Sequence, residues 1–472
     1  MSKVNDKVIR TYMAFGLPVD PANVRTLVDL DLSYALAATL VEWSPARQIV
    51  AGLAESWEIT TEKEIAFKVR KNLKWSNGEP VLASQVVASL DRAKKVHGDS
   101  LKSLFDMVLA IKAVGNDKIL LTLKVKAATS GILNKLTEPM YGVLRLTDTG
   151  SVDLGTTVGP FTLVASSADE LKLAVNRKWF GYDPKMADEV TIRRPAKGEE
   201  LQASFLNDSW VNLMTSSSLV EEATHEKYKQ QQYAIWNRNL DKIFFLSPSL
   251  KMTNKDGQEL FQFLSQNLNR AALTKGMSGF SLSDQFFPSG YILFDPEFTK
   301  RKFTGEVPKK YKQAPLTILG ADSRLNNTVQ ASIKGEIKRL TGIEPKFKLV
   351  SLSEFEKTRG AGDYDFVAAA LPVNDPNVEG AMGFFFGLTP PIIPDAGDGK
   401  LAFSKRIAEA KKFDSQNIKN AEYRKVFSDA TNAGSILPLF HYSTVVIAKE
   451  GMDLSQVPMS DETVAFSKVR FK

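Results

Sequence analysis

The chain has 472 residues, more than one hydrophobic core supports, so about three folding units are expected. Apolar residues make up 43% and charged residues 24%, a globular composition that excludes disordered and fibrous classes. Cysteine is absent and only three histidines occur, which excludes disulfides, thiolate catalysis and multi-histidine metal sites. The net charge of +7 is too diffuse to indicate a nucleic-acid groove.

No apolar run reaches the roughly 18–20 residues that cross a bilayer. The segment from Met1 to Asp6 lacks the apolar core of a signal peptide. We therefore expect either a cytosolic protein or one whose signal sequence was removed, and the composition does not choose between them.

The first half of the chain predicts an α+β arrangement. An opening strand over 4–15 ends at Asp20-Pro21, and apolar residues three and four apart predict a helix over 30–43. The elements predicted next are a strand within 57–75, the turn Asn77-Gly78, a helix over 84–95, strands over 118–126, 161–164 and 171–176, and helices over 199–207 and 219–232. The block 31–152 is expected to be compact.

The second half alternates helices and strands. The predicted order is helix 258–273, strand 316–320, helix 327–341, strand 346–350, helix 353–359 and strand 365–371. This order predicts a parallel sheet, and the continuous apolar strand 365–371 indicates burial on both faces. Helices over 401–413 and 420–433 and strands over 436–448 and 463–471 complete the chain.

Ligands of open α/β sheets bind outside the carboxyl ends of the strands. Here the rule selects Asp322, after the first parallel strand, and the loop that follows the third. That loop runs from Pro372 through Asn374 and Asp375 to Pro376. The alternative is that this loop is a proline-framed turn without a ligand.

Catalytic motifs are missing. Gly399-Lys400 is followed by Leu401, so no phosphate-binding loop forms, and His225-Glu226 lacks the second histidine of a metalloprotease helix. Paired carboxylates such as Glu221-Glu222 lie on polar, solvated helix faces. We expect no enzyme activity, no metal and no cofactor.

Aromatic recognition is the remaining chemistry. Phe384, Phe385 and Phe386 cannot all point inward from one helix or strand, so at least one is expected to face a cleft or a partner. The alternative is that two are core residues and one fills a gap. Further candidates are Met214 with Thr215, and Tyr141, for which a strand end or turn is the alternative.

Several motifs resemble a known family. Ile49-Val-Ala-Gly-Leu-Ala-Glu-Ser-Trp57, Ile65-Ala-Phe-Lys-Val-Arg70 and Trp75-Ser-Asn-Gly78 are similar to the signature of family 5 extracellular solute-binding proteins. These are the peptide-, dipeptide- and nickel-binding receptors of ABC importers. Later matches, in the family's order, are Val158-Gly-Pro-Phe161, Asn176-Arg-Lys-Trp179, Asp363-Tyr-Asp365, Asn374-Asp375-Pro376 and Leu437-Pro-Leu-Phe-His441.

The resemblance implies an α/β fold of the bilobal periplasmic-binding-protein type (type II, cluster C) with an extra α+β subdomain on lobe one. Lobe one would comprise 1–30, 153–242 and 439–472, with 31–152 as the appended subdomain, and lobe two would comprise 243–438. Strand crossings near 241–246 and 436–442 would form the hinge.

The resemblance also implies a ligand site. The expected lining residues are Tyr141, Met214, Thr215, Asp322, Pro372, Asn374, Asp375, Phe384, Phe385, His441 and Tyr442. The family's amino-group-binding carboxylate falls on Pro372, and a tryptophan of the same pocket falls on Ala369. This departure leaves open whether peptides with a free amino terminus bind.

The implied function is that of a substrate-binding protein of an ABC importer, which captures a peptide-like or other small solute between two lobes by hinge closure. The alternative is a sensor or scaffold protein with a modified cleft. The expected partners are the solute and an ABC permease in the membrane, with no nucleic acid. A monomer at the periplasmic or extracellular face of the cell envelope is expected, and the identity of the solute stays open.

Overall fold

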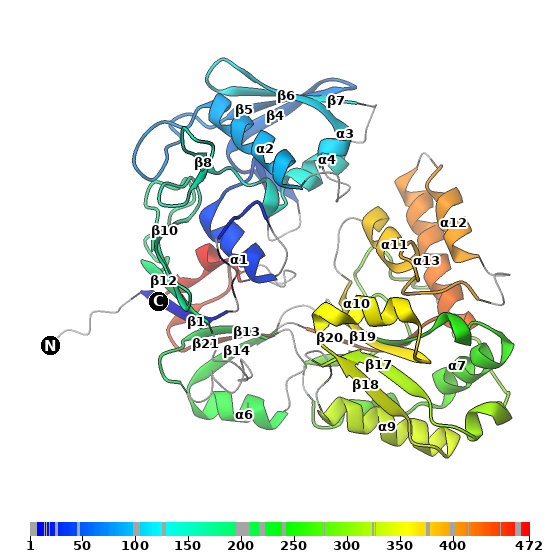
Figure 1. The fold of residues 1–472 in the computed structure, drawn as a ribbon. Helices are drawn as coiled ribbons and strands as arrows, with labels where there is room; N and C mark the ends of the chain where they lie inside the picture. The colour runs from blue at the N-terminus through cyan, green and yellow to red at the C-terminus, as the bar shows by residue number, and fades with distance from the viewer. Residues whose placement is uncertain are drawn as a thin grey trace. The chain divides into compact units, whose positions relative to one another are not determined.

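The computed structural model describes residues 7–13, 15, 17, 19–23, 27–44, 48–97, 104–124, 129–194, 208–216, 222–237, 242–277, 279–322, 325, 327–373, 378–396, 402–413, 415–443, 445–457 and 464–472 (Figure 1). The chain forms two compact units. Unit 1 comprises Met1–Thr215, Lys227–Trp236 and Val446–Lys472, and unit 2 comprises Ser216–Glu226 and Asn237–Val445.

Unit 1 contains a four-stranded sheet in the order β1-β12-β11-β10. Its strands are β1 (Val8–Tyr12), β10 (Phe161–Ser166), β11 (Glu170–Val175) and β12 (Glu189–Arg193). β1 runs parallel to β12, and the other pairs are antiparallel. Helix α1 (Leu27–Leu36) contributes Leu32 and Leu36 to the same core as Ile9 and Phe161.

Shorter elements complete this part of unit 1. A three-stranded sheet has the order β13-β21-β14 and consists of β13 (Leu213–Ser216), β14 (Tyr233–Asn237) and β21 (Val445–Lys449). Helix α6 (Glu222–Gln230) precedes β14, and its residues up to Glu226 belong to unit 2. A small hairpin near the C-terminus pairs β22 (Met452–Asp453) with β23 (Arg470–Phe471), and the 3-10 helix η5 (Phe466–Lys468) lies between them in the sequence.

The segment predicted as an appended subdomain has a core of its own. Its sheet has the order β4-β5-β7-β6, from β4 (Ala54–Thr61), β5 (Glu64–Val69), β6 (Val108–Val114) and β7 (Lys118–Leu123). The helices are α2 (Ala83–His97), α3 (Leu104–Met107), α4 (Thr129–Leu136) and the 3-10 helix η1 (Pro139–Tyr141). Two short hairpins pair β2 (Val41–Trp43) with β3 (Ile49–Ala51) and β8 (Arg145–Leu146) with β9 (Val152–Asp153). Val86 and Leu90 of α2 pack with Phe67 and Leu121 of the sheet, as the helical spacing predicted.

Two predictions for unit 1 are corrected by the structure, and one strand was not predicted. The helix predicted over 30–43 ends at Leu36, because Val41–Trp43 form strand β2, which pairs with β3. The strand predicted within 57–75 is the hairpin of β4 and β5. β6 was not predicted, because polar and apolar residues do not alternate in Val108-Leu-Ala-Ile-Lys-Ala-Val114.

Unit 2 is built on a six-stranded sheet in the order β16-β20-β15-β19-β17-β18. The strands are β15 (Lys242–Pro248), β16 (Phe280–Leu282), β17 (Thr317–Ala321), β18 (Lys346–Val350), β19 (Phe366–Pro372) and β20 (Leu437–Tyr442). β17 pairs in parallel with both β18 and β19, which confirms the predicted parallel sheet. β15 and β20 join it in antiparallel pairing, and β15 lies between β19 and β20.

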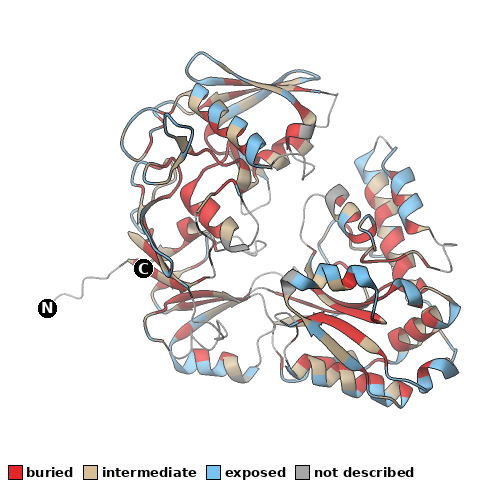
Figure 2. Cartoon of the chain, viewed as in Figure 1, coloured by how far each residue is buried: buried red, intermediate tan, exposed pale blue. Residues whose placement is uncertain are grey.

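The inner strands β15, β19 and β20 of this sheet are largely buried, whereas the edge strands β16 and β18 are partly exposed (Figure 2). Helices cover both faces of the sheet. They are α7 (Lys255–Asn267), α8 (Arg270–Leu273), α9 (Asn327–Thr341), α10 (Leu352–Ala361), α11 (Val378–Phe386), α12 (Phe403–Ala410) and α13 (Gln416–Ala433), with the 3-10 helices η2 (Leu250–Met252) and η3 (Lys309–Lys312). Phe244 of β15 packs in the cluster with α7 and α9, and its neighbour Phe245 packs in the cluster with α11, α12 and α13. This alternation of faces follows from the pleat of a strand.

Two further predictions for unit 2 are corrected. The helix predicted over 258–273 is interrupted, because Asn269 caps a new helix by accepting a hydrogen bond from the N–H of Ala272. Residues 439–442 were assigned to lobe one, but they belong to β20, which is hydrogen-bonded between β16 and β15 in unit 2.

Candidate functional site

The ends of several strands bring predicted site residues to one edge of the unit-2 sheet. β17 and β19 are parallel neighbours, with Leu319 opposite Val367, so their carboxyl ends share an edge. Asp322 follows β17, Pro372 ends β19, and both are exposed. Asn374 and Asp375 lie outside the described residues.

The antiparallel strands β15 and β20 add two residues to this edge. Lys242, the first residue of β15, is paired with Pro372 of β19 on one side and with Tyr442 of β20 on the other. Residues far apart in the sequence therefore meet here. We call the set Lys242, Asp322, Pro372 and Tyr442 the carboxyl edge.

Lys242 was missed by the sequence analysis. In the sequence, Lys242 is a single cation at the start of the otherwise apolar run Lys242-Ile-Phe-Phe-Leu246. No catalytic or ligand-binding motif marks this position. In the structure its residue surface is 0% exposed, and that of Tyr442 is 2% exposed.

His441 lies on the opposite face of the sheet from Tyr442, because successive residues of a strand point to opposite faces. It is buried, and its Nε2 atom lies 2.9 Å from the carbonyl oxygen of Phe286. Burial lowers the pKa of His441 to about 4, so the imidazole is neutral at neutral pH.

The three consecutive phenylalanines of α11 divide between core and surface. Phe385 and Phe386 are buried, whereas Phe384 is 44% exposed. The Phe385 ring is 4.8 Å from that of Phe286 and 5.3 Å from that of Phe384. Of the two predicted lining rings, only that of Phe384 has a substantial exposed surface.

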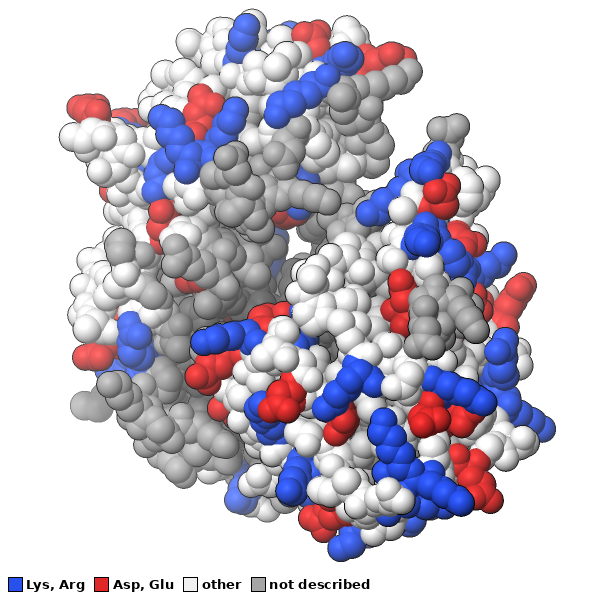
Figure 3. Space-filling view, turned by 45° about the vertical axis from the view of Figure 1, so that its right-hand side comes forward, with Lys and Arg blue, Asp and Glu red and all other residues white. Residues whose placement is uncertain are grey.

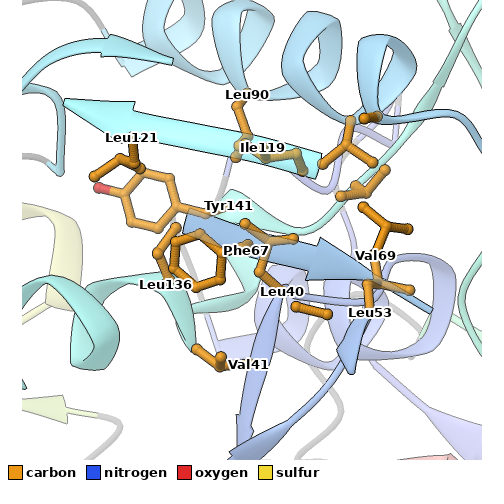
Figure 4. Packing of buried hydrophobic residues seen from close by; sticks show 14 of the residues in the cluster. Leu40, Val41, Leu53, Phe67, Val69, Leu90, Ile119, Leu121, Leu136 and Tyr141 are labelled. Atoms are coloured by element: carbon orange, nitrogen blue, oxygen red, sulfur yellow. The ribbon is translucent and has the colours of Figure 1, made fainter. Parts of the chain in front are cut away.

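The unit-1 candidates occupy different environments. Tyr141 is buried in the core of the β4–β7 sheet (Figure 4). Its ring contacts that of Phe105, and its hydroxyl oxygen accepts a hydrogen bond from the N–H of Leu104. Met214 of β13 is buried and Thr215 beside it is half-buried. The packing of Tyr141 does not favour contact with a solute, because core side chains fill the space around its ring.

A polar hollow of about 410 Å³ in unit 1 is lined by Asp208, Ser209, Gln230, Gln231, Gln232, Tyr233 and Lys449. Its charged groups already make internal bonds: Lys449 Nζ donates to the Ser209 carbonyl at 2.7 Å, and Asp208 accepts from the Tyr12 hydroxyl at 2.7 Å. Open α/β sheets bind their ligands outside the carboxyl ends of the strands, and for that reason we favour the carboxyl edge as the solute site.

Among the described residues, no group of three or more histidines and carboxylates could hold a metal ion. No described helix has the length and apolarity that a membrane span requires. On the face shown in Figure 3, acidic and basic side chains of the described residues are intermingled rather than gathered into a basic stripe.

Comparison with known proteins adds independent information. The model described as bacterial extracellular solute-binding proteins, family 5 (middle) matches residues 48–390. The dipeptide-binding protein DppE of Bacillus subtilis is 20% identical to the chain over 460 residues, covering 87% of this chain and 84% of DppE. The periplasmic oligopeptide-binding protein OppA of Haemophilus influenzae is 38% identical over 69 residues, which cover 14% of this chain and 13% of OppA.

Solved structures share the fold. NikA from Brucella suis in complex with Fe(III)-EDTA has a TM-score of 0.77 at 15% identity, covering 98% of this chain and 100% of NikA. OppA from Haemophilus influenzae in complex with RPPGFSPFR has a TM-score of 0.70 at 15% identity, covering 99% of each chain. These likenesses confirm the predicted α/β bilobal class.

Proposed function

The chain belongs to family 5 of the bacterial extracellular solute-binding proteins, the receptors of ABC importers, and from that premise we propose that it binds a peptide-like solute at the carboxyl edge of unit 2. The observation that supports this site is the convergence of Lys242, Asp322, Pro372 and Tyr442, from four strands or strand ends, at one edge. Open α/β sheets bind their ligands at such an edge.

The chemistry expected of this site is binding without reaction. Backbone groups and a few charged side chains orient the solute, and exposed aromatic surface such as Phe384 contacts its apolar parts. A permease in the membrane is the proposed partner, and we propose that the receptor acts as a monomer on the periplasmic or extracellular side of the envelope.

We propose that solute binding shifts the population of arrangements of the two units. A solute shifts this equilibrium only by the difference between its binding free energies for the two arrangements. A nearly complete shift requires a difference of about 5.5 kcal/mol. Small-angle scattering with and without a saturating solute tests this step, because the radius of gyration is expected to decrease. An unchanged radius at saturation would contradict the closure mechanism but not the binding function.

The binding function itself is tested by two matched variants. Phe384→Ala removes an exposed ring in unit 2, and the control Phe413→Ala removes a ring that is also exposed, at 42% against 44%. Native mass spectrometry of freshly purified protein identifies any copurified solute. Calorimetry with a panel of di- and tripeptides then measures the affinities. We expect Phe384→Ala to weaken peptide binding about tenfold and Phe413→Ala to leave it unchanged, with both variants as stable as the parent.

Other results of this experiment are equally informative. Equal affinity of the two variants would remove Phe384 from the site while leaving the function intact. If no copurified solute and no peptide of the panel bound, the sensor or scaffold alternative would be favoured.

A further inference from the structure

The stretch from Lys300 to Lys312 in unit 2 is rich in basic residues that the proposed solute site does not use. It contains six lysines and arginines and one acidic residue, Glu306. Lys300 is half-buried and lies 2.7 Å from Asp284. The other five basic residues are all exposed, and we call residues 301–312 the basic segment. They are Arg301, Lys302, Lys309, Lys310 and Lys312.

The basic segment runs along helix α7. Gln266 Nε2, near the end of α7, donates a hydrogen bond to the carbonyl oxygen of Arg301 at 2.8 Å. The Tyr311 hydroxyl lies 3.3 Å from Sδ of Met252, which precedes α7. The segment therefore spans the length of this helix, about 20 Å at the rise of an α-helix. Val307 and Tyr311 are buried in the same core cluster as residues of α7, so the segment is fixed by its apolar residues.

The five exposed cations of the segment are not neutralised by neighbouring carboxylates. Among the residues that the structure describes, none of the five forms an ion pair. Acidic groups beside the segment are engaged elsewhere, since Asp365 lies 3.2 Å from Lys251 and Glu259 lies 3.8 Å from Lys255. Glu306 and Asp256, at the start of α7, reduce the positive charge of this surface without cancelling it.

The form of this surface indicates the kind of anion that it fits. A single phosphate or carboxylate is bound by donors that converge in a concave site. Here the cations stand on long side chains that are spread along an exposed segment. Four of the five are lysines, which are strongly hydrated point charges without the planar fork of arginine that pairs with carboxylates of an acidic protein. Clusters of four to eight basic residues bind anionic lipid head groups, and each residue increases binding about fivefold.

We propose that the basic segment docks the protein on a membrane surface that carries anionic lipid head groups. Charge complementarity and the spread of the cations over the length of α7 favour this partner. The segment contains none of the residues of the carboxyl edge, so the docking surface is an addition to the proposed solute site and does not depend on it.

Vesicle sedimentation tests this inference with the full chain. The probes are vesicles of phosphatidylcholine alone and vesicles of phosphatidylcholine mixed with phosphatidylglycerol. The test variant combines Lys309→Gln, Lys310→Gln and Lys312→Gln. The control variant combines three substitutions in unit 1, at lysines that are also exposed and form no ion pair with a described residue, so both variants have the same net charge. The control substitutions are Lys63→Gln, Lys74→Gln and Lys94→Gln.

We expect the parent and the control variant to bind the mixed vesicles and to leave the neutral vesicles unbound. The test variant is expected to bind the mixed vesicles about 100-fold more weakly, because it lacks three cations that each contribute about fivefold. Added salt should weaken binding of the parent, since it screens exposed charges. All substituted side chains are exposed, so circular dichroism and peptide affinity are expected to stay unchanged in both variants.

Four results would overturn the inference. The first is absence of binding of the parent to the mixed vesicles, and the second is equal binding of the parent to neutral and mixed vesicles. The third is an equal loss in the test and control variants, which would assign the effect to net charge. The fourth is displacement of the parent by soluble polyphosphate at an equal concentration of phosphate groups, which would assign the segment to soluble polyanions. None of these results affects the proposed solute binding, because peptide affinity is measured separately.

Discussion

At the scale of single residues, packing rather than residue type decides which candidates reach a surface. Phe384 and Phe385 are chemically identical neighbours, yet one is exposed and the other is buried. Tyr141, His441 and Tyr442 stand beside predicted turns or strand ends, which suggested accessibility, but all three are buried. The sequence shows how polar and apolar residues alternate along an element. It does not show which residues from distant parts of the chain pack against that element.

Gly159 illustrates a constraint that only the structure explains. A Cβ atom at this position would lie 2.6 Å from the carbonyl carbon of Leu36 and 2.7 Å from the backbone nitrogen of Ala37. Backbone atoms at the end of α1 cannot move aside as a flexible side chain can. Glycine is therefore required where β10 approaches α1.

We predict that Gly159→Ala lowers the free energy of unfolding of unit 1 by at least about 2 kcal/mol, because it forces two backbone segments apart. The control is Gly131→Ala in α4, where a Cβ atom would have no neighbour within 4 Å. Alanine is the better helix former, so the control is expected to be neutral or stabilising by up to about 1 kcal/mol. Urea unfolding followed by tryptophan fluorescence measures both, and equal stabilities would refute the argument.

His441 predicts how stability depends on pH. Its pKa is lowered from 6.5 to about 4 by burial, so the folded protein binds fewer protons than the unfolded chain between these values. The stability that this residue contributes is complete above pH 6.5 and decreases as the pH falls towards 4. Between pH 7.5 and 5 we expect a loss of about 2 kcal/mol from this residue.

The variant His441→Gln keeps a side-chain N–H for the Phe286 carbonyl but does not titrate. Its free energy of unfolding, measured by circular dichroism in urea at pH 7.5 and 5, should depend less on pH than that of the parent by this amount. The same pH dependence in both proteins would exclude His441 as the cause.

At the scale of elements, the sequence analysis succeeded where periodicity is strong and uninterrupted. The predicted helix over 327–341 has the bounds of α9, and the strand predicted over 346–350 has those of β18. It failed where two elements join. α1 ends at Leu36 although Leu40 and Trp43 continue the helical spacing, because β3 offers β2 a hydrogen-bonding partner that a local pattern does not show.

Ion pairs and hydrogen bonds link the C-terminal part of α7 to two segments that follow it in the sequence. Asp284 Oδ1 lies 2.9 Å from Arg270 Nη2 and 2.7 Å from Lys300 Nζ, and both cations also donate to the carbonyl oxygen of Ser265. Arg270 and Lys300 are mostly buried, and burial lowers the pKa of both. One carboxylate therefore balances two poorly hydrated cations.

We predict that Asp284→Asn lowers the stability of unit 2 by about 2 kcal/mol, because it leaves both cations without a compensating charge. Glu344→Gln is the control, since it breaks the ion pair with Lys338 in which both side chains are more than half exposed. Surface pairs of this kind contribute about 0.5 kcal/mol or less. Urea unfolding followed by circular dichroism compares them, and similar losses would show that burial is not the deciding factor.

At the scale of the whole molecule, the family and the α/β class could be predicted from motifs that span most of the chain. The boundary of the units was harder. β20 is continuous in sequence with β21, yet the two strands belong to different sheets. Only Ser443 and Thr444 separate them, so no change of composition marks the crossing.

The tryptophans provide a test of the two-unit division. All six, Trp43, Trp57, Trp75, Trp179, Trp210 and Trp236, lie in unit 1. Fluorescence therefore reports the unfolding of unit 1, whereas circular dichroism reports both units. We predict that the two urea transitions do not coincide, since each unit has its own core. Gly159→Ala should lower the urea midpoint of the fluorescence transition and leave unchanged the midpoint of the circular dichroism transition that reports unit 2. Superimposable curves in both proteins would indicate a single cooperative unit.

The pairing of Lys242 with Tyr442 has a consequence for how such a chain can evolve. The long stretch between these residues starts and finishes on neighbouring strands, which lie about 5 Å apart. A segment whose two ends lie close together can be inserted, duplicated or recombined as one unit, because both of its junctions with the rest of the chain lie at the same place in the fold. Related chains could thus exchange this segment in one genetic step.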